Sequence, residues 1–169
     1  VLQHAAATGA IAESLLATLE SVATSPAAWD GMTSAFGAAL AEPTTLSPAI
    51  LRDFESRVGA WHRDRRGDPD AAEAAFARAL SHDAMNAELL SSLASIQRRA
   101  KGRPLVESLL RLSQATGGDL ELLREAAEIA TSAIADRALA KSILERLAKL
   151  AIERWELDAP TDTVIDGTI

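Results

Sequence analysis

The sequence lacks cysteine and tyrosine, and it has no long apolar run. Without cysteine the chain can form no disulfide, so its stability depends on packing alone. Aromatic residues make up only 4% of the chain. No stretch approaches the ~18 consecutive apolar residues that a membrane-spanning helix needs. We therefore expect a soluble chain without a membrane span, with the cytoplasm as the default location.

Signals of catalysis are also scarce. The three histidines, His4, His62 and His82, do not have the spacing of a zinc site. The chain has neither a Gly-Lys-Ser/Thr phosphate loop nor a Gly-x-Ser-x-Gly nucleophile elbow. We therefore expect a protein that is not an enzyme and that carries no metal and no cofactor.

Acidic residues outnumber basic ones, and the formal net charge is −7. The phosphates of nucleic acids and of anionic membranes repel such a chain at long range. Helical repeats that read single-stranded RNA need a polar code repeated on successive helices, and the sequence shows none. We therefore expect a protein or peptide as the partner, and not a nucleic acid.

Alanine and leucine dominate the apolar residues, and both favour helix. Apolar residues recur every three or four positions along almost the whole chain, which predicts an all-α fold of about eight helices. The first six are expected over residues 10–23, 26–41, 48–66, 69–82, 86–100 and 104–116. The last two are expected to be capped by Asp119 and Asp136.

Three of the predicted helices start with the same local signal. Ser25-Pro26, Ser47-Pro48 and Asp68-Pro69 each place a capping side chain before a proline. Proline fits the first turn of a helix, where its missing N–H would have no partner in any case. Gly67 is expected to end the helix that begins at Pro48, because glycine readily adopts the left-handed conformation found there.

A three-fold internal repeat runs through the second half of the chain. Two sets of residues recur at intervals of 34 residues: Ala72, Val106 and Ala140, and Phe76, Leu110 and Leu144. A period of this length is typical of stacked helix pairs. Such arrays display an extended surface to a partner and seldom carry out chemistry themselves.

Residues 67–86 resemble the second helix and following turn of a tetratricopeptide repeat. That family places small, aromatic and small residues along this helix, as Ala72, Phe76 and Ala79 do here. Asp83 and Asn86 match the turn, although Ala84 replaces its usual proline. The pairs Val58-Gly59, Leu93-Ala94 and Ala126-Ala127 are plausible counterparts of the large and small residues in the family's first helices.

The resemblance implies an α-solenoid of antiparallel helix pairs with a concave face that holds a peptide or a partner's helix. It covers three pairs, about 48–82, 86–116 and 119–157. Residues 1–45 form an N-terminal hairpin that is either a degenerate repeat or a cap. Residues 158–169 form a polar tail, in which Thr163-Val164-Ile165 packs on its own array or is ordered by something else.

Basic residues gather at two of the predicted turns. We call this set the basic rim: Arg63, Arg65, Arg66, Arg98, Arg99, Lys101 and Arg103. Stacking would bring its two halves together, and an acidic partner could then dock on it. The alternative is that these cations complement helix dipoles, an effect of ~0.3–1 kcal/mol each that needs no partner.

The exposed side of the first helices is a second candidate surface. The resemblance implies that the concavity is lined by Arg57, Glu88, Ser91, Ser95, Arg98, Glu125 and Ser132. Trp61 is either an anchor for a partner or a core residue, and the usual burial of tryptophan favours the core. The predicted partner-binding residues are therefore Arg57, Trp61, Arg65, Glu88, Ser91, Ser95, Arg98 and Arg99.

The two ends of the predicted array each carry a tryptophan, Trp29 and Trp155. The last helix is expected to carry one apolar stripe, formed by Ile143, Leu144, Leu147, Ala148, Ala151 and Trp155. The end faces of a solenoid must be covered, either by the chain itself or by another chain.

These patterns predict a protein-interaction scaffold within a larger bacterial protein, since the chain starts at Val1 and is rich in alanine and arginine. One alternative is an assembly module that self-associates or joins subunits through its ends or its tail. Another is a regulatory helical segment of a multidomain enzyme.

Overall fold

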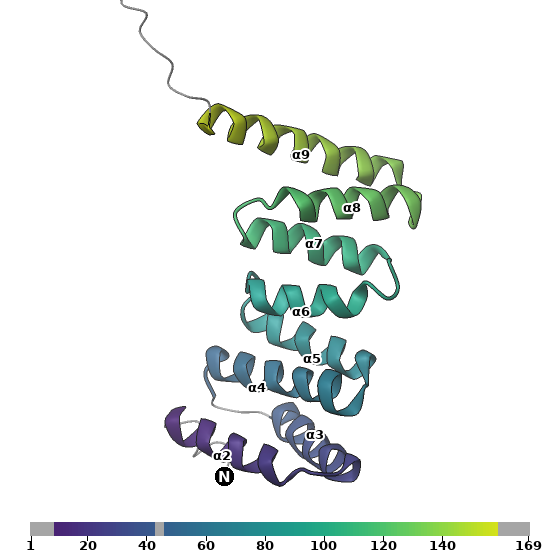
Figure 1. The fold of residues 1–169 in the computed structure, drawn as a ribbon. Helices are drawn as coiled ribbons and strands as arrows, with labels where there is room; N and C mark the ends of the chain where they lie inside the picture. The colour runs from purple at the N-terminus through teal and green to yellow at the C-terminus, as the bar shows by residue number, and fades with distance from the viewer. Residues whose placement is uncertain (1–8, 43–45, 159–169) are drawn as a thin grey trace, which may run out of the picture. The chain divides into compact units, whose positions relative to one another are not determined.

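The computed structural model describes residues 9–42 and 46–158, and this part of the chain is all-α (Figure 1). The tail with Thr163-Val164-Ile165 lies outside the described residues. The elements are α2 (Gly9–Val22), α3 (Pro26–Ala41), α4 (Pro48–Trp61), the π-helical turn η1 (His62–Arg66), α5 (Pro69–His82), α6 (Ala87–Gln97), α7 (Arg103–Ala115), α8 (Leu120–Ser132) and α9 (Arg137–Asp158). None of the described helices is apolar over enough of its length to cross a bilayer.

The predicted helix starts are confirmed at all three Ser-Pro and Asp-Pro signals. Ser25, Ser47 and Asp68 each accept a hydrogen bond from a backbone N–H of the first turn, at distances of 3.3, 3.4 and 3.0 Å. These bonds satisfy donors that have no partner within the helix. Gly67 ends the helical run with a φ of 62°, in the left-handed region that glycine tolerates.

The chain divides into two compact units, residues 1–99 and 100–169. The first contains α2 to α6, and the second contains α7 to α9. The division falls inside the predicted helix pair at 86–116. The pairing of α6 with α7 as one repeat therefore stays a prediction.

In the first unit, α4 and α5 form a closely packed antiparallel pair (Figure 1). A methyl group added at Gly59 would lie 2.9 Å from Cε1 of Phe76, so the missing side chain is what allows the close approach. Ala72 and Ala79 are fully buried, and Phe76 is 2% exposed. The small and aromatic positions expected along α5 are thus core positions.

An aromatic cluster packs on another side of α4. The Trp61 ring meets Phe36 edge to face, with centroids 5.1 Å apart, and it lies 6.1 Å from Trp29. Phe54 completes the cluster, and Leu16 of α2 is buried in the same core. The interpretation of Trp61 as a core residue is confirmed, since its side chain is almost wholly buried.

The second unit is built from α7, α8 and α9, which pack in chain order. Its core is apolar and draws on all three helices, with Leu105, Val106, Leu109, Leu123, Ala126, Ala130 and Ile143 buried. Arg103 and Asp136 form an ion pair at 2.7 Å between the starts of α7 and α9.

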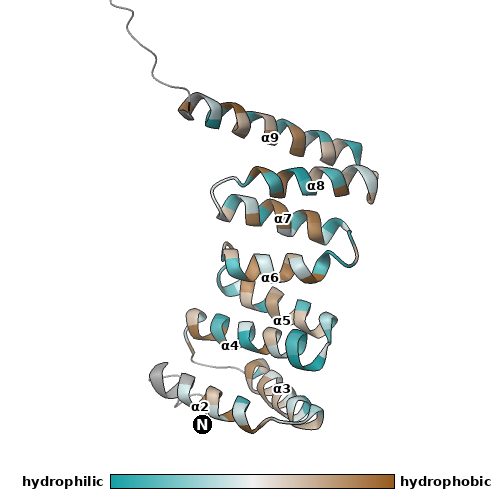
Figure 2. Ribbon diagram, in the orientation of Figure 1, coloured by the Kyte–Doolittle hydropathy of each residue, from teal (hydrophilic) through white to brown (hydrophobic). Residues whose placement is uncertain are grey.

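The predicted apolar stripe of α9 is buried only in part. Ile143 is buried, but Leu144 is 50% exposed and Trp155 is 74% exposed. Successive residues on a helix are about 100° apart, so Ile143 and Leu144 face different directions. Apolar residues consequently remain on the outer side of α9, where brown and teal segments alternate along the ribbon (Figure 2).

Gly59→Ala should destabilise the first unit by ~1–3 kcal/mol, because the buried Phe76 ring cannot move away from the added methyl group. Gly31→Ala is the matched control, since a methyl group there meets nothing within 4 Å in the middle of α3. Replacing that helical glycine should stabilise by ~0.5–1 kcal/mol. Urea denaturation followed by tryptophan fluorescence measures both effects. Equal stabilisation by the two changes would contradict the proposed close approach.

Candidate partner-binding groove

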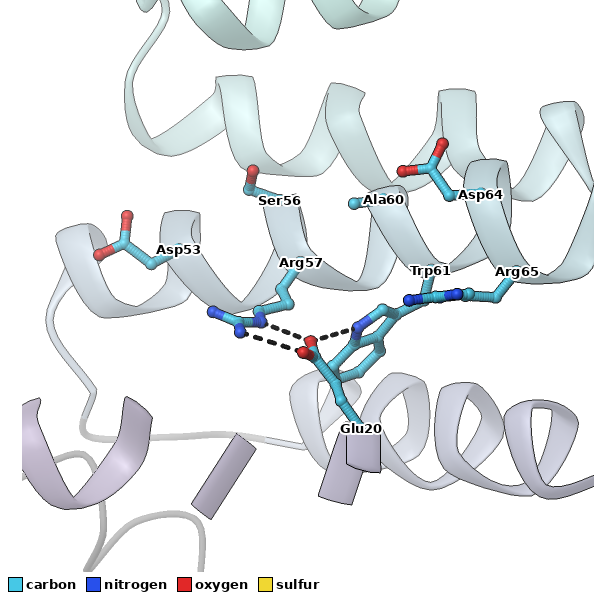
Figure 3. Close-up of a pocket in the computed structure, with 8 residues that line it drawn as sticks. All are labelled: Glu20, Asp53, Ser56, Arg57, Ala60, Trp61, Asp64 and Arg65. Carbon is cyan, nitrogen blue, oxygen red and sulfur yellow. Dashed lines mark hydrogen bonds and ion pairs between the residues drawn. The ribbon is translucent and has the colours of Figure 1, made fainter. Parts of the chain in front are cut away.

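An open hollow of about 440 Å³ lies along α4 in the first unit (Figure 3). We call it the α4 groove, and it is lined by Glu20, Asp53, Ser56, Arg57, Ala60, Trp61, Asp64 and Arg65. All of these except Glu20 belong to α4 or η1, at spacings that place them on one side of a helix. The small side chains of Ser56 and Ala60 leave the groove open between longer neighbours.

The carboxylate of Glu20 forms a polar contact between α2 and α4. Arg57 donates to it through Nε at 2.8 Å and through Nη2 at 3.3 Å. The indole Nε1–H of Trp61 donates to the same carboxylate at 2.7 Å. Figure 3 shows Arg57 and Trp61 converging on Glu20 from α4.

This arrangement favours the charged form of Glu20. The hydrogen bonds from Arg57 hold the pKa of Glu20 below its ordinary value, although partial burial opposes them. The Trp61 N–H and the positive charge of Arg65 lower this pKa further. The groove therefore stabilises a carboxylate at this position.

Arg65 supplies a second cation at the groove. Its guanidinium lies 5.2 Å from the centroid of the Trp29 ring, within cation–π range. Among the described residues it has no carboxylate within 4.0 Å, unlike Arg57. The π-helical turn that carries Arg65 closes with a hydrogen bond of 2.9 Å from the Asp68 N–H to the His62 carbonyl.

The two aspartates of the groove are held by arginines next to them in the sequence. Arg52 binds Asp53 at 2.6 Å, and Arg63 binds Asp64 at 2.7 Å. The hydrogen bond from Arg63 lowers the pKa of Asp64. These contacts offset part of the negative charge of the groove.

Several residues of the basic rim also form ion pairs within their own unit. Arg66 binds Asp30 at 2.5 Å, and Arg99 binds Asp70. Arg98 has interactions of its own as well. Lys101 and Arg103 belong to the second unit. A rim that joins both groups of cations therefore stays a prediction.

The structure brings together three of the predicted partner-binding residues, Arg57, Trp61 and Arg65. Glu88, Ser91 and Ser95 lie exposed on α6, outside the groove, and Arg98 and Arg99 follow that helix. Five lining residues were not predicted from the sequence: Glu20, Asp53, Ser56, Ala60 and Asp64. Helical spacing from Arg57 could have identified the last four. Glu20 lies 37 residues before Arg57, too far for any local pattern to connect them.

A second hollow lies on the second unit and is almost wholly apolar. Residues of α9 and the end of α8 line it, among them Ala140, Leu144 and Ala148. Further along α9, Ile152 is 57% exposed and Trp155 is 74% exposed. Apolar surface concentrated on one helix is typical of a protein contact.

The described residues contain no cluster of three or more side chains suited to hold a metal ion. Comparison of the chain with family models, curated proteins and solved structures gave no match. The resemblance to tetratricopeptide repeats therefore stays a prediction that rests on the residues.

Glu20→Gln should remove an acid-sensitive contribution to the stability of the first unit. Because the folded-state pKa of Glu20 is lowered, its contribution is complete above the ordinary glutamate pKa of about 4.3 and is lost as the pH falls through the lower folded value. The stability difference between wild type and variant should be largest above about pH 5 and shrink below about pH 4. Urea denaturation at several pH values measures this difference, and a constant one would contradict the assigned interaction.

Proposed function

We propose that this chain is a protein-interaction segment that holds a peptide or a helix of a partner protein in the α4 groove. The observation that carries the proposal is the convergence of Arg57, Arg65 and the Trp61 indole on one open hollow. The hollow is within the usual range of ligand sites, about 300–1,000 Å³. Arginine is also among the residues most often found to dominate binding energy at protein interfaces.

The chemistry of the groove suits binding better than catalysis. It presents guanidinium groups, carboxylates and a small-residue floor, which can hold a partner through ion pairs and close backbone contact. The rigid support comes from Trp61, which is locked in the aromatic cluster. A preformed site loses less entropy on binding than a mobile one. Composition alone supports the further proposal that the segment works in the bacterial cytoplasm.

Ala60→Arg should block the groove, because a long charged side chain would extend from its floor. Ala74→Arg is the matched control, since Ala74 is exposed on α5 outside the groove. We would select peptides from a random display library on the purified wild-type chain and measure their affinities for all three proteins. The selected peptides should bind the control like wild type and bind Ala60→Arg at least about tenfold more weakly, a loss typical of a hot spot.

Selected peptides that bind Ala60→Arg as tightly as wild type would contradict this function. A fold check by circular dichroism accompanies each protein. Both arginines lie on helices and favour helix, so neither change should unfold the first unit.

A second candidate function is self-assembly through α9, favoured by its exposed Leu144, Ile152 and Trp155. The ion pairs Lys141–Glu145 and Lys149–Glu153 lie on the same helix. An apolar strip with charged neighbours is the usual composition of a contact between helices.

Assembly through α9 predicts a dimer or larger species that a charge on the strip disrupts. The double change Leu144→Glu with Trp155→Glu should give a monomer, because it buries carboxylates in the contact. Ser142→Glu, also exposed on α9, should leave the mass unchanged. Size-exclusion chromatography with light scattering measures the mass of each protein. A wild-type chain that stays monomeric at high concentration would exclude assembly through α9.

A further inference from the structure

We propose that the partner segment is acidic and that it places a carboxylate between Arg57, Trp61 and Arg65, where the carboxylate of Glu20 lies in the free protein. This inference rests on the proposed function, since it names the chemistry of the ligand for the same groove. It also gives α2 a role as an internal competitor of the partner.

The donors and the carboxylate come from different helices. Arg57 and Trp61 both lie on α4, whereas Glu20 lies on α2. The Trp61 ring is fixed by Phe36, at 5.1 Å between centroids, and by Trp29. The indole N–H therefore keeps its direction whether or not Glu20 occupies the site.

The N–H groups of Arg57 and Trp61 need a hydrogen-bond acceptor. A buried N–H without a hydrogen-bond partner is costly, and Trp61 is only 4% exposed. A guanidinium that binds a carboxylate through two nitrogens recognises the shape of the group as well as its charge. If Glu20 leaves, another carboxylate is the group that satisfies both donors with the same geometry.

The position of Glu20 can be reached through the groove. The side chain of Glu20 is 29% exposed, and the groove opens beside it. A partner in the groove can therefore reach the Glu20 position from the open side.

The charges around the groove favour an acidic partner over a basic one. Asp53 and Asp64 are bound by Arg52 and Arg63, so they offer a basic partner little unsatisfied charge. Arg65 forms no direct ion pair among the described residues, although its charge acts on Glu20 and Asp64, and it lies at the same end of the groove as Trp61. A segment with two nearby carboxylates would use both Arg57 and Arg65.

The test uses a peptide of five Glu-Ala repeats as the acidic probe and one of five Gln-Ala repeats as its neutral match. Glu20→Gln removes the internal carboxylate while it keeps the size of the side chain. This variant should bind the acidic probe about tenfold more tightly than wild type, because the competitor formed charge-assisted hydrogen bonds. The neutral probe should bind neither protein.

Glu107→Gln is the control for net charge, because it removes one negative charge from an exposed position of α7. It should bind the acidic probe like wild type. The NMR signal of the Trp61 indole N–H gives a local readout, assigned with Trp61→Phe. In Glu20→Gln the acidic probe should move this signal back toward its wild-type position.

Arg65→Gln provides a second variant, in case Glu20→Gln weakens the packing of α2. It should lower the affinity of the acidic probe severalfold, because it removes a charge-assisted contact. The inference would be overturned if Glu20→Gln and Glu107→Gln raised the affinity for the acidic probe equally. It would also be overturned if Arg65→Gln left that affinity unchanged.

The inference and the proposed function fail in different ways. If the library-selected peptides bind Ala60→Arg weakly but the acidic probe binds Glu20→Gln and wild type with equal affinity, only the inference is wrong. If the selected peptides ignore Ala60→Arg, the proposed function itself is wrong.

Discussion

The carboxylate of Glu20, held by Arg57 and Trp61, is the contact on which the first unit's groove depends. It lies between two helices, and it accepts a hydrogen bond from the indole N–H of Trp61, a residue that is 4% exposed with Glu20 in place. Without an acceptor that N–H would cost about 1–3 kcal/mol, comparable with the effect of a typical core substitution. One acidic side chain thus links the position of α2 to the groove along α4.

The groove exists because α4 is packed on two other sides. Gly59 lets α5 approach so closely that the Phe76 ring occupies the space of a side chain. Trp61 and Phe54 pack against α2 and α3 in the aromatic cluster. What remains is a narrow strip with the small residues Ser56 and Ala60 at its centre. Core packing therefore determines which residues of α4 line the groove.

Local signals predicted the helices well, because a cap or a terminating glycine acts within a few residues. The capping side chain of Asp68 and the left-handed Gly67 are examples. The groove was predicted only in part. Arg57 and Trp61 were predicted from the resemblance and from residue type, but their partner Glu20 comes from a distant helix. For the same reason the pairing of Arg66 with Asp30 could not be foreseen, since these residues lie 36 positions apart.

The most direct test of this account is amide hydrogen exchange in α2, measured by NMR for wild type, Glu20→Gln and Glu107→Gln. If the contact of Glu20 with Arg57 and Trp61 holds α2 in place, Glu20→Gln should raise the exchange rates of α2 amides by about tenfold, while those of α5 stay unchanged. Glu107→Gln should match wild type. Equal α2 rates in all three proteins would contradict the account, because the helix would then be held by apolar packing alone.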